Sequence, residues 1–511
     1  MPSVANAAAG PSRSRRLNYP FTLGVASGDP LPDAVVIWTR LAPEPLQLDG
    51  GMPPRKVAVQ WEISEHEDFR RPVRREVAIA SPEDAHTVHI DVRGLRPHHW
   101  YWYRFRAEGE ISPVGRTRTA PAIGTAPAIA FAFASCSQYE HGYFTAYRHL
   151  ADENPDVIFH LGDYIYEYAP NSYVAPGGNV RDHVGAEITT IEDYRRRYAQ
   201  YRTDGDLQHA HAVAPWIVIW DDHEVDNNYA DHIPENGDPS QGNESAESFL
   251  ARRAAAYKAY WEHMPLRSDR RAVGPDLPLY RGFEYGNTAS FSVLDTRQYR
   301  TDQPCNDMFP AGCGEEFDLD ATILGDAQAT WLEERLASSQ GVWNVIPQQI
   351  FFANLDLEAG GPTENDPRDG GYPDGWDGYR ASRHRLLDFV ADRGIENFVV
   401  LTGDIHSHYL ADLRRDFEDE SSPIVGTELV GSSITSGGDG SDQSSFFPLL
   451  IPENPHLRYN SNRRGYVTCE LDADTFRVDY QAVDYVSAPG APIRTDRSYV
   501  IEAGDPQAHD A

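Results

Sequence analysis

The sequence predicts an all-β sandwich followed by a larger α/β domain. Up to about residue 119, short runs of alternating apolar and polar residues such as KVAVQWEIS and TVHIDVRGL are separated by turns, which is typical of an immunoglobulin- or fibronectin-like sandwich. Farther along, strand-like runs alternate with helical patterns such as ESFLARRAAAYKAYWEHM, which indicates an α/β sheet covered by helices. A chain of 511 residues is long enough to fill both cores.

The segment TAPAIGTAPA separates the two parts and has the composition of a linker. We expect residues 18–120 to form the sandwich, residues 127–490 to form the α/β domain and residues 491–511 to form a C-terminal tail. Residues 1–17 are small and polar with an Ala-rich patch, which resembles what remains after a signal peptide is removed. We therefore expect this first segment to be disordered or processed.

The cysteines indicate the compartment of the protein. Cys305 and Cys313 flank a short loop that contains Gly, Pro and Asn, so we expect them to form a disulfide. Because disulfides persist in oxidising compartments, this pair and the N-terminal segment predict a secreted protein whose signal peptide has been removed. Cys469 lies in the strand-like run GYVTCEL and is expected to be a buried core thiol.

The charge of the chain excludes one class of partner. A formal net charge of −33 leaves no basic surface to neutralise phosphates, so we expect no nucleic-acid polymer as a partner. The acidity suits cation binding or simply keeps the surface hydrated. No apolar stretch reaches the roughly 18 residues of a membrane span, so we expect at most peripheral contact with a membrane. The oligomeric state stays open.

Four apolar runs of the α/β part each end at residues that bind metal ions. Buried parallel strands have such continuous apolar sequences, and open α/β sheets bind ligands beyond the carboxyl ends of their strands. We therefore expect the four segments to deliver their side chains to one edge, as a metal site. The runs are IAFAFAS before Cys136, DVIFHLG before Asp163, WIVIW before Asp221 and Asp222, and NFVVLTG before Asp404 and His406.

Soft donors predict iron on one side of this site. Cys136 and Tyr166 supply a thiolate and a phenolate, which favour the ferric state. His406 would be a natural further ligand of the same ion. Asp163, which precedes Tyr166 in a G-D-x-x-Y motif, has two carboxylate oxygens and can bridge to a second ion.

Hard donors predict a different metal on the other side. Asp163, Asp222 and Asp404 offer only oxygen atoms, which suit calcium, magnesium or manganese. We predict Fe(III) beside Ca(II), with Mn, Mg or Zn possible in their place. Two adjacent metal ions polarise a phosphoryl group and generate a metal-bound hydroxide as the nucleophile for displacement at phosphorus.

The motifs resemble those of the alkaline phosphatase D (PhoD-like) family of metallophosphoesterases, to which some secreted phospholipase D enzymes are also similar. In the order of that family they are FTLGVASGDP, VVIWTRL, FASCSQ, HLGDYIYEY, WDDHEVDNNY, LDTRQYR and LTGDIHSH. The resemblance implies a calcineurin-like metallophosphoesterase sandwich for the α/β domain and a hydrolase of phosphoesters. It also implies the ligands: Cys136, Asp163, Tyr166 and His406 for ferric iron, and Asp163, Asp222 and Asp404 for calcium.

His223 is the predicted catalytic residue, acting with Asp222 and Asp163. It stands in the DDHE motif, where it should face the phosphate and either stabilise the oxyanion or protonate the leaving oxygen. The alternative is a histidine that only hydrogen-bonds behind a ligand. Asp221 and Glu224 are expected to orient the ligands.

Three further residues are candidates for substrate binding. Arg297 and Arg300 in LDTRQYR could donate forked hydrogen bonds to the phosphate, or they could form structural ion pairs. Asn227 could contribute an oxygen atom to the site or cap the segment that follows.

The predicted function is a secreted, metal-dependent hydrolase of phosphomonoesters, phosphodiesters or both. A phospholipase D-type phosphodiesterase is the main alternative, and a non-catalytic phosphate- or metal-binding protein is another. Residues 358–376 form a Gly-, Pro- and Asp-rich insertion that could be a lid or a surface loop. Aromatic residues in and around it could bind a lipid or nucleotide headgroup, or belong to the core. They are Phe351, Phe352, Tyr372, Trp376 and Tyr379.

Overall fold

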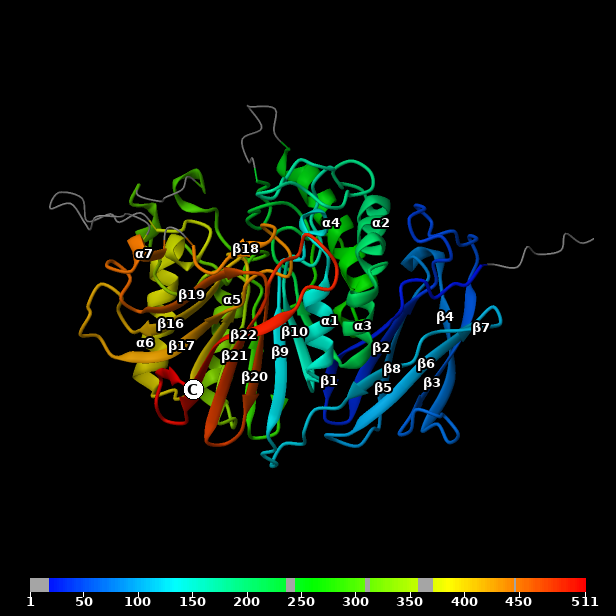
Figure 1. The fold of residues 1–511 in the computed structure, drawn as a ribbon, viewed down its shortest axis with the longest axis horizontal. Coiled ribbons are helices and arrows are strands. Elements are labelled where there is room, and N and C mark those ends of the chain that lie inside the picture. The colour runs from blue at the N-terminus through cyan, green and yellow to red at the C-terminus, as the bar shows by residue number, and fades with distance from the viewer. Residues whose placement is uncertain (1–17, 236–243, 308–312, 357–370, 445–446) are drawn as a thin grey trace, which may run out of the picture.

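Two large mixed sheets packed face to face form the body of the protein (Figure 1). The computed structural model describes residues 18–235, 244–307, 313–356, 371–444 and 447–511. One sheet has ten strands in the order β23-β22-β21-β20-β9-β10-β11-β1-β2-β5, and the other has eight in the order β12-β13-β14-β15-β17-β16-β19-β18. The expected N-terminal 1–17 segment and most of the 358–376 insertion lie outside the described residues.

The centre of the ten-stranded sheet is parallel and fully buried. β9 (Ile129–Ala134), β10 (Val157–Leu161) and β11 (Trp216–Ile219) run parallel, and their continuous apolar sequences reflect burial on both faces. The other strands of this sheet are β1 (Val25–Leu31), β2 (Ala34–Arg40), β5 (Thr87–Arg93), β20 (Gly465–Leu471), β21 (Thr475–Val483), β22 (Ile493–Glu502) and β23 (Ala508–Asp510).

The eight-stranded sheet also has a parallel centre. β13 (Ala289–Val293), β14 (Trp343–Pro347), β15 (Phe398–Thr402) and β17 (Ile424–Val430) run parallel to one another. Antiparallel strands complete it at both edges: β12 (Arg281–Tyr285), β16 (His408–Arg414), β18 (Gly440–Ser441) and β19 (Leu457–Arg463).

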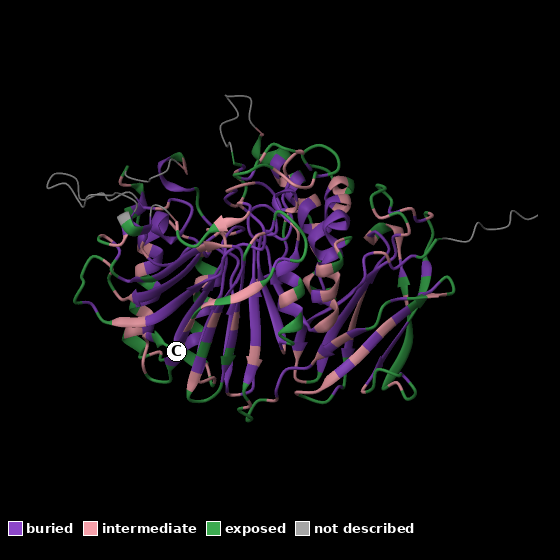
Figure 2. Cartoon of the chain, viewed as in Figure 1, coloured by how far each residue is buried: buried purple, intermediate pink, exposed green. Residues whose placement is uncertain are grey.

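Alternate residues of the eight-stranded sheet enter two different cores. Val345 and Val399 pack with the ten-stranded sheet, whereas Ile346 and Val400 pack beneath the helices on the other face. Between the sheets, the Phe291 ring lies 4.8 Å from the Phe159 ring. Figure 2 shows the strands of both sheets buried along most of their length.

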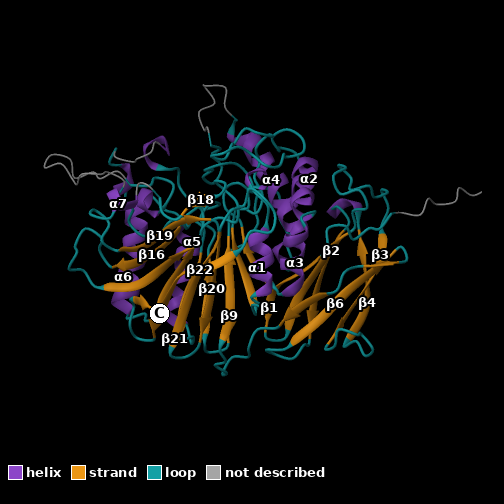
Figure 3. Ribbon diagram, viewed as in Figure 1, coloured by secondary structure: helices purple, strands orange, loops and turns teal. Residues whose placement is uncertain are grey.

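Helices cover the outer faces of the two sheets (Figure 3). The first four helices lie on the ten-stranded sheet, and α5 and α6 contribute Leu332 and Leu387 to the core behind the eight-stranded sheet. The helices are α1 (Thr145–Asp152), α2 (Ile191–Arg202), α3 (Gly205–Val213), α4 (Ala246–His263), α5 (Gly325–Ser338), α6 (Arg380–Arg393) and α7 (Phe447–Leu450).

The N-terminal region forms a two-layered β structure, as predicted. A five-stranded sheet packs its buried side chains, such as Trp61 and Tyr103, against Val35 and Ile37 of β2. Its strands are β3 (Val57–Ser64), β4 (Arg74–Ala80), β6 (Trp100–Ala107), β7 (Glu110–Ile111) and β8 (Gly115–Arg118). The immunoglobulin or fibronectin type of this sandwich is not confirmed, because β1, β2 and β5 continue the ten-stranded sheet of the α/β part.

The expectation of a C-terminal tail at residues 491–511 was wrong. β22 pairs along its length with β21, and β23 pairs with β22, so this segment forms the edge of the ten-stranded sheet. Most side chains of β22 are half-exposed or exposed, as expected for a strand near a sheet edge. The sequence of β22 therefore lacks the continuous apolar run that marks the central strands.

Three of the cysteines have the states that the sequence predicts. Cys305 and Cys313 form the predicted disulfide, and Cys469 is a buried free thiol, also as predicted. Within the described ranges, none of the helices has the length and apolar character needed to traverse a bilayer.

Gly28 packs β1 against β11 of the ten-stranded sheet, and its replacement tests how close this packing is. β1 pairs in parallel with β11 at Gly28 and Trp216. A Cβ at position 28 would lie 2.6 Å from the Trp216 carbonyl oxygen and 2.7 Å from that of Pro265. We expect Gly28→Ala to lower the free energy of unfolding by about 1–3 kcal/mol, as measured by denaturant unfolding. Gly205→Ala, which has nothing within 4 Å of its added Cβ, is the control and should not destabilise. Equal free energies of unfolding for the two variants would contradict the close packing of β1 against β11 at Gly28.

Candidate metal centre

The predicted ligands come together where the parallel strands of the two sheets end. Cys136, Asp163 and Asp222 follow β9, β10 and β11 of the ten-stranded sheet, and Asp404 and His406 follow β15 of the eight-stranded sheet. Together with Asp221 and His223, they form three overlapping groups of possible ligand atoms, and the atoms of each group all lie within 4.8 Å of one another. The groups are Cys136, Asp163 and His406; Asp163, Asp222 and His223; and Asp221, Asp222 and Asp404.

The backbone at this edge is strained. Cys136, Asp163, Asp404 and His406 all have φ between 54° and 60°, a left-handed conformation that non-glycine residues rarely adopt. Such conformations cost about 1–3 kcal/mol each and persist where the surrounding structure enforces them, often at functional sites. A backbone hydrogen bond helps to hold Cys136 in this conformation: its N–H donates to the Gly162 carbonyl at 3.1 Å.

The conformation of Gly162 explains why the G-D-x-x-Y motif begins with glycine. Its φ of +106° is left-handed, and a Cβ there would collide with the side chain of Asp221. The loops after β10 and β11 can therefore approach closely only because this position is glycine.

Soft and hard donors meet at Asp163. The Tyr166 hydroxyl donates to Asp163 Oδ2 at 2.8 Å and lies 3.2 Å from His406 Nε2. Burial and the Asp163 carboxylate raise the pKa of the Cys136 thiol well above its usual value. A bound cation would reverse this effect, because it stabilises the thiolate.

The carboxylate side of the centre has oxygen atoms that lack partners. Asp163 Oδ1, Asp221 Oδ2 and Asp222 Oδ1 are buried and have no hydrogen-bond partner. Burial, with Asp221 next in effect, raises the pKa of Asp404 well above its usual value. Buried carboxylate oxygens without hydrogen bonds are costly unless positive charge lies nearby, so this donor set fits a metal centre.

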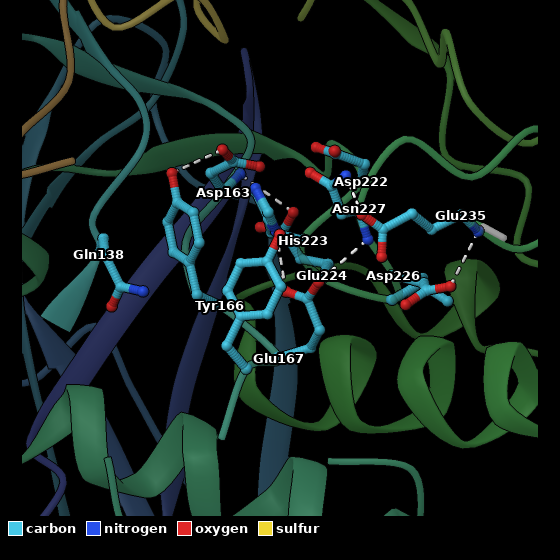
Figure 4. A network of polar contacts seen from close by, with 12 residues as sticks. Gln138, Asp163, Tyr166, Glu167, Asp222, His223, Glu224, Asp226, Asn227 and Glu235 are labelled. Atoms are coloured by element: carbon cyan, nitrogen blue, oxygen red, sulfur yellow. Dashed lines mark hydrogen bonds and ion pairs between the residues drawn. The ribbon is translucent and has the colours of Figure 1, made fainter. Parts of the chain in front are cut away.

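His223 is held by a residue that the sequence analysis missed. Its Nδ1 lies 2.8 Å from Glu167 Oε2, and Glu167 Oε1 accepts the Asn227 N–H at 3.0 Å (Figure 4). Although burial opposes it, the carboxylates of Glu167 and Asp222 raise the pKa of His223 well above its usual value. The only signal of Glu167 in the sequence is an acidic residue directly after Tyr166 in an otherwise aromatic run.

Glu224 fixes the loops that carry the ligands. Its carboxylate accepts the N–H groups of Asp163 at 3.0 Å, Tyr164 at 2.6 Å and Asp221 at 2.8 Å. These are the contacts of an orienting residue, and they join the loops after β10 and β11.

Arg297 and Arg300 do not have the predicted position for phosphate binding. Both are almost completely buried, and the described residues that line the cavity beside the centre include neither of them. Arg297 pairs with Asp221 at 2.5 Å and Asp374 at 2.8 Å, and Arg300 pairs with Asp374 at 3.1 Å. Of the two roles considered for them, these contacts favour structural ion pairs, because Asp374, which is distant in sequence, pairs with both guanidinium groups. Arg297 Nη2 nevertheless lies 3.7 Å from Asp222 Oδ1, so its charge stabilises that carboxylate.

A cavity of about 680 Å³ opens beside the centre. Asn227 lines it, while its amide group donates to Glu235 at 2.7 Å. Of the five aromatic residues considered for substrate binding, Tyr372 lines the cavity, and its hydroxyl donates to Asp404 Oδ2 at 3.1 Å. The other four are buried in the core behind the eight-stranded sheet. The lining residues are Asp163, Tyr168, Tyr173, Asp222, His223, Asn227, Asn228, Leu355, Tyr372, Asp404, Ile405, His406, Tyr409, Ser444 and Leu450.

Comparison with known proteins gives consistent likenesses over nearly the whole chain. The model of the PhoD-like phosphatase family matches residues 131–480, and the model of its N-terminal domain matches residues 5–121. The chain is 51% identical to alkaline phosphatase D of Bacillus subtilis (strain 168) over 487 residues, which cover 95% of this chain and 81% of that protein.

Solved structures agree with these matches. The structure of PhoD is similar with a TM-score of 0.93 and 50% identity, covering 98% of this chain and 93% of that one. The purple acid phosphatase PPD1 of yellow lupin is similar with a TM-score of 0.52 and 11% identity, covering 96% of this chain and 74% of that one. The second likeness concerns the fold alone and agrees with the sandwich predicted for the α/β domain.

Proposed function

Because this chain belongs to the PhoD-like phosphatase family and is therefore a phosphoester hydrolase of the alkaline phosphatase D type, we propose that its reaction takes place in the cavity beside the strained strand ends. The observation that carries this proposal is the overlap of three groups of side chains that could hold a metal ion: Asp163 belongs to the first two groups and Asp222 to the last two. The enzyme assignment replaces the alternative of a non-catalytic binding protein.

The donor chemistry supports two different metal ions. Fe(III) would be held by Cys136, Asp163, Tyr166 and His406, and Ca(II) by Asp163, Asp222 and Asp404, with Mn, Mg or Zn as alternatives. When bound, such a pair supplies Lewis-acid polarisation of the phosphoryl group and activation of the attacking water. The side chains of the protein contribute orientation, charge and the movement of a proton.

His223 is proposed to protonate the leaving oxygen. Because Nδ1 is held by Glu167, Nε2 is the ring nitrogen that can face the cavity, and its proton would pass to the departing alcohol. The pKa of His223, which Glu167 and Asp222 raise although burial opposes them, favours the protonated ring that this role requires. Asn227, whose N–H is also held by Glu167, is proposed to contact the substrate.

The lining of the cavity supports a phosphodiester over a phosphomonoester. Histidines are the sole basic side chains among the described lining residues, so apart from the proposed metal ions the lining offers no lysine or arginine to the second charge of a monoester. Apolar residues also line part of the cavity, as the phospholipase D-type alternative requires. We propose secretion as well, which the disulfide supports.

A visible absorption spectrum with elemental analysis tests the proposed metals. Thiolate and phenolate ligands on ferric iron should give an intense charge-transfer band, so we expect a coloured protein that contains iron and calcium. The band should disappear when iron is removed by a chelator after reduction. A colourless, active protein that contains zinc or manganese would refute the proposed metals without affecting the hydrolase assignment.

A further inference from the structure

One wall of the cavity is apolar and belongs to the eight-stranded sheet and its loops. Leu355 follows β14, Ile405 follows β15, Tyr409 lies in β16 and Leu450 ends α7. These side chains cannot accept or donate hydrogen bonds apart from the Tyr409 hydroxyl. The wall therefore offers little to phosphate oxygens or sugar hydroxyls.

The proposed proton donor belongs to the part of the lining that the other sheet contributes. His223 follows β11, and Tyr168 and Tyr173 follow β10 of the ten-stranded sheet. The His223 ring lies 4.1 Å from the Tyr166 ring and 5.3 Å from the Tyr168 ring. A leaving oxygen that is protonated by His223 thus lies on this side. A group that stays on phosphorus is equatorial in an in-line displacement, so it projects sideways from the axis between nucleophile and leaving oxygen and can reach side chains of the other sheet.

Polar contacts behind the apolar wall hold its residues in place. The Leu355 N–H donates to Asp377 Oδ2 at 2.7 Å. The Asn454 side chain donates to the carbonyl of Leu450 at 2.9 Å and to that of Asp356 at 2.7 Å. Asn454 therefore connects the two segments that carry Leu355 and Leu450.

Tyr409 is fixed by aromatic packing. Its ring meets the Phe351 ring edge-on at 5.4 Å and the Phe447 ring at 5.9 Å. The wall is thus formed before substrate binds, which reduces the entropic cost of binding.

We propose that the apolar wall of Leu355, Ile405, Tyr409 and Leu450 is a subsite for an alkyl or aryl group that remains on phosphorus after the leaving alcohol departs. The preferred substrates are then phosphodiesters with an apolar retained group. This inference rests on the proposed function, in particular on the leaving oxygen facing His223.

A series of alkyl p-nitrophenyl phosphodiesters tests the subsite on the metal-loaded enzyme. The leaving group is constant, and the retained group grows from methyl through butyl to hexyl. Each buried methylene should raise kcat/KM by up to about fourfold until the cavity is filled. The 2-methoxyethyl diester, which has the length of the butyl compound but contains an ether oxygen, should react several-fold more slowly than the butyl diester.

Variants locate the effect at the wall. Leu450→Asn and Leu355→Asn should each flatten the dependence of kcat/KM on chain length. Leu319→Asn is the matched control, because Leu319 is 77% exposed and does not belong to the cavity lining. It should keep the dependence of the natural enzyme. If either wall variant fails to fold, the other variant and the series on the natural enzyme still decide the question.

The outcomes separate this inference from the function on which it rests. A kcat/KM that rises with chain length and flattens in the wall variants supports the subsite. A flat or falling series on an enzyme that hydrolyses p-nitrophenyl phosphate or the methyl diester overturns the subsite alone, as does an unchanged slope in folded wall variants. An enzyme that hydrolyses none of these esters overturns the proposed function.

Discussion

Cys136→Ala should remove bound iron together with the charge-transfer band and should lower kcat/KM by about 10²–10⁴-fold. A metal ion supplies several kcal/mol of transition-state stabilisation, and each 1.36 kcal/mol is worth a factor of ten. Cys136 is the thiolate donor among the proposed iron ligands, and ligand atoms of Asp163 and His406 lie within 4.8 Å of its sulfur. Elemental analysis, the visible spectrum and steady-state kinetics on one preparation would measure all three effects.

Cys469→Ala is the matched control for this experiment. Cys469 is the other free, buried cysteine among the described residues, and it lies opposite Phe131 in the same ten-stranded sheet. Its replacement removes a thiol of equal burial but should leave iron, colour and activity in place. Full iron content and activity in Cys136→Ala would refute the assignment of Cys136 as a ligand.

His223→Ala should slow the hydrolysis of esters with poor leaving groups by about 10²–10⁴-fold. Alkyl alcohols need a proton as they depart, whereas p-nitrophenolate leaves without one, so the loss should be far smaller for p-nitrophenyl esters. A plot of log kcat/KM against the pKa of the leaving alcohol should be steeper for the variant. Equal losses for all leaving groups would show that His223 does not act as an acid.

Glu167→Gln should shift the pH dependence while preserving the fold. The Glu167 charge raises the pKa of His223, so its loss should lower that pKa. The proton is then lost at lower pH, and the alkaline limb of kcat/KM for alkyl esters should move toward lower pH. Glu428→Gln is the control, because Glu428 is also buried and accepts the N–H groups of Phe352 and Ala353 at 2.8 Å. An unmoved limb in a folded Glu167→Gln enzyme would contradict the pairing.

Local sequence patterns predicted which candidate ligand residues gather at the strand ends. Continuous apolar runs mark β9, β10, β11 and β15 because buried parallel strands are apolar on both faces. The residue after each run had to lie at the common edge, so the grouping of Asp163, Asp222 and Asp404 near Cys136 followed from the topology. The disulfide of Cys305 followed similarly from residues that are close in sequence.

Contacts between distant segments were not predictable in this way. Arg297 and Asp374 are separated by 77 residues, and no periodicity connects them. The sequence therefore left two roles open for Arg297, and its ion pair with Asp374 favours the structural one. The same holds for Glu167, whose partner His223 is 56 residues away.

The sequence by itself determined the class of the protein, the two-layered N-terminal region and the donors at the strand ends, since each depends on short-range pattern or on motif. Only the tertiary structure decided that β1 joins the ten-stranded sheet, that the last residues form its edge, and that apolar side chains line the cavity beside Asp163, Asp222 and Asp404. The physical reason is that side-chain periodicity reports which face of a strand is buried, but the partner that buries it is selected by packing over the whole chain.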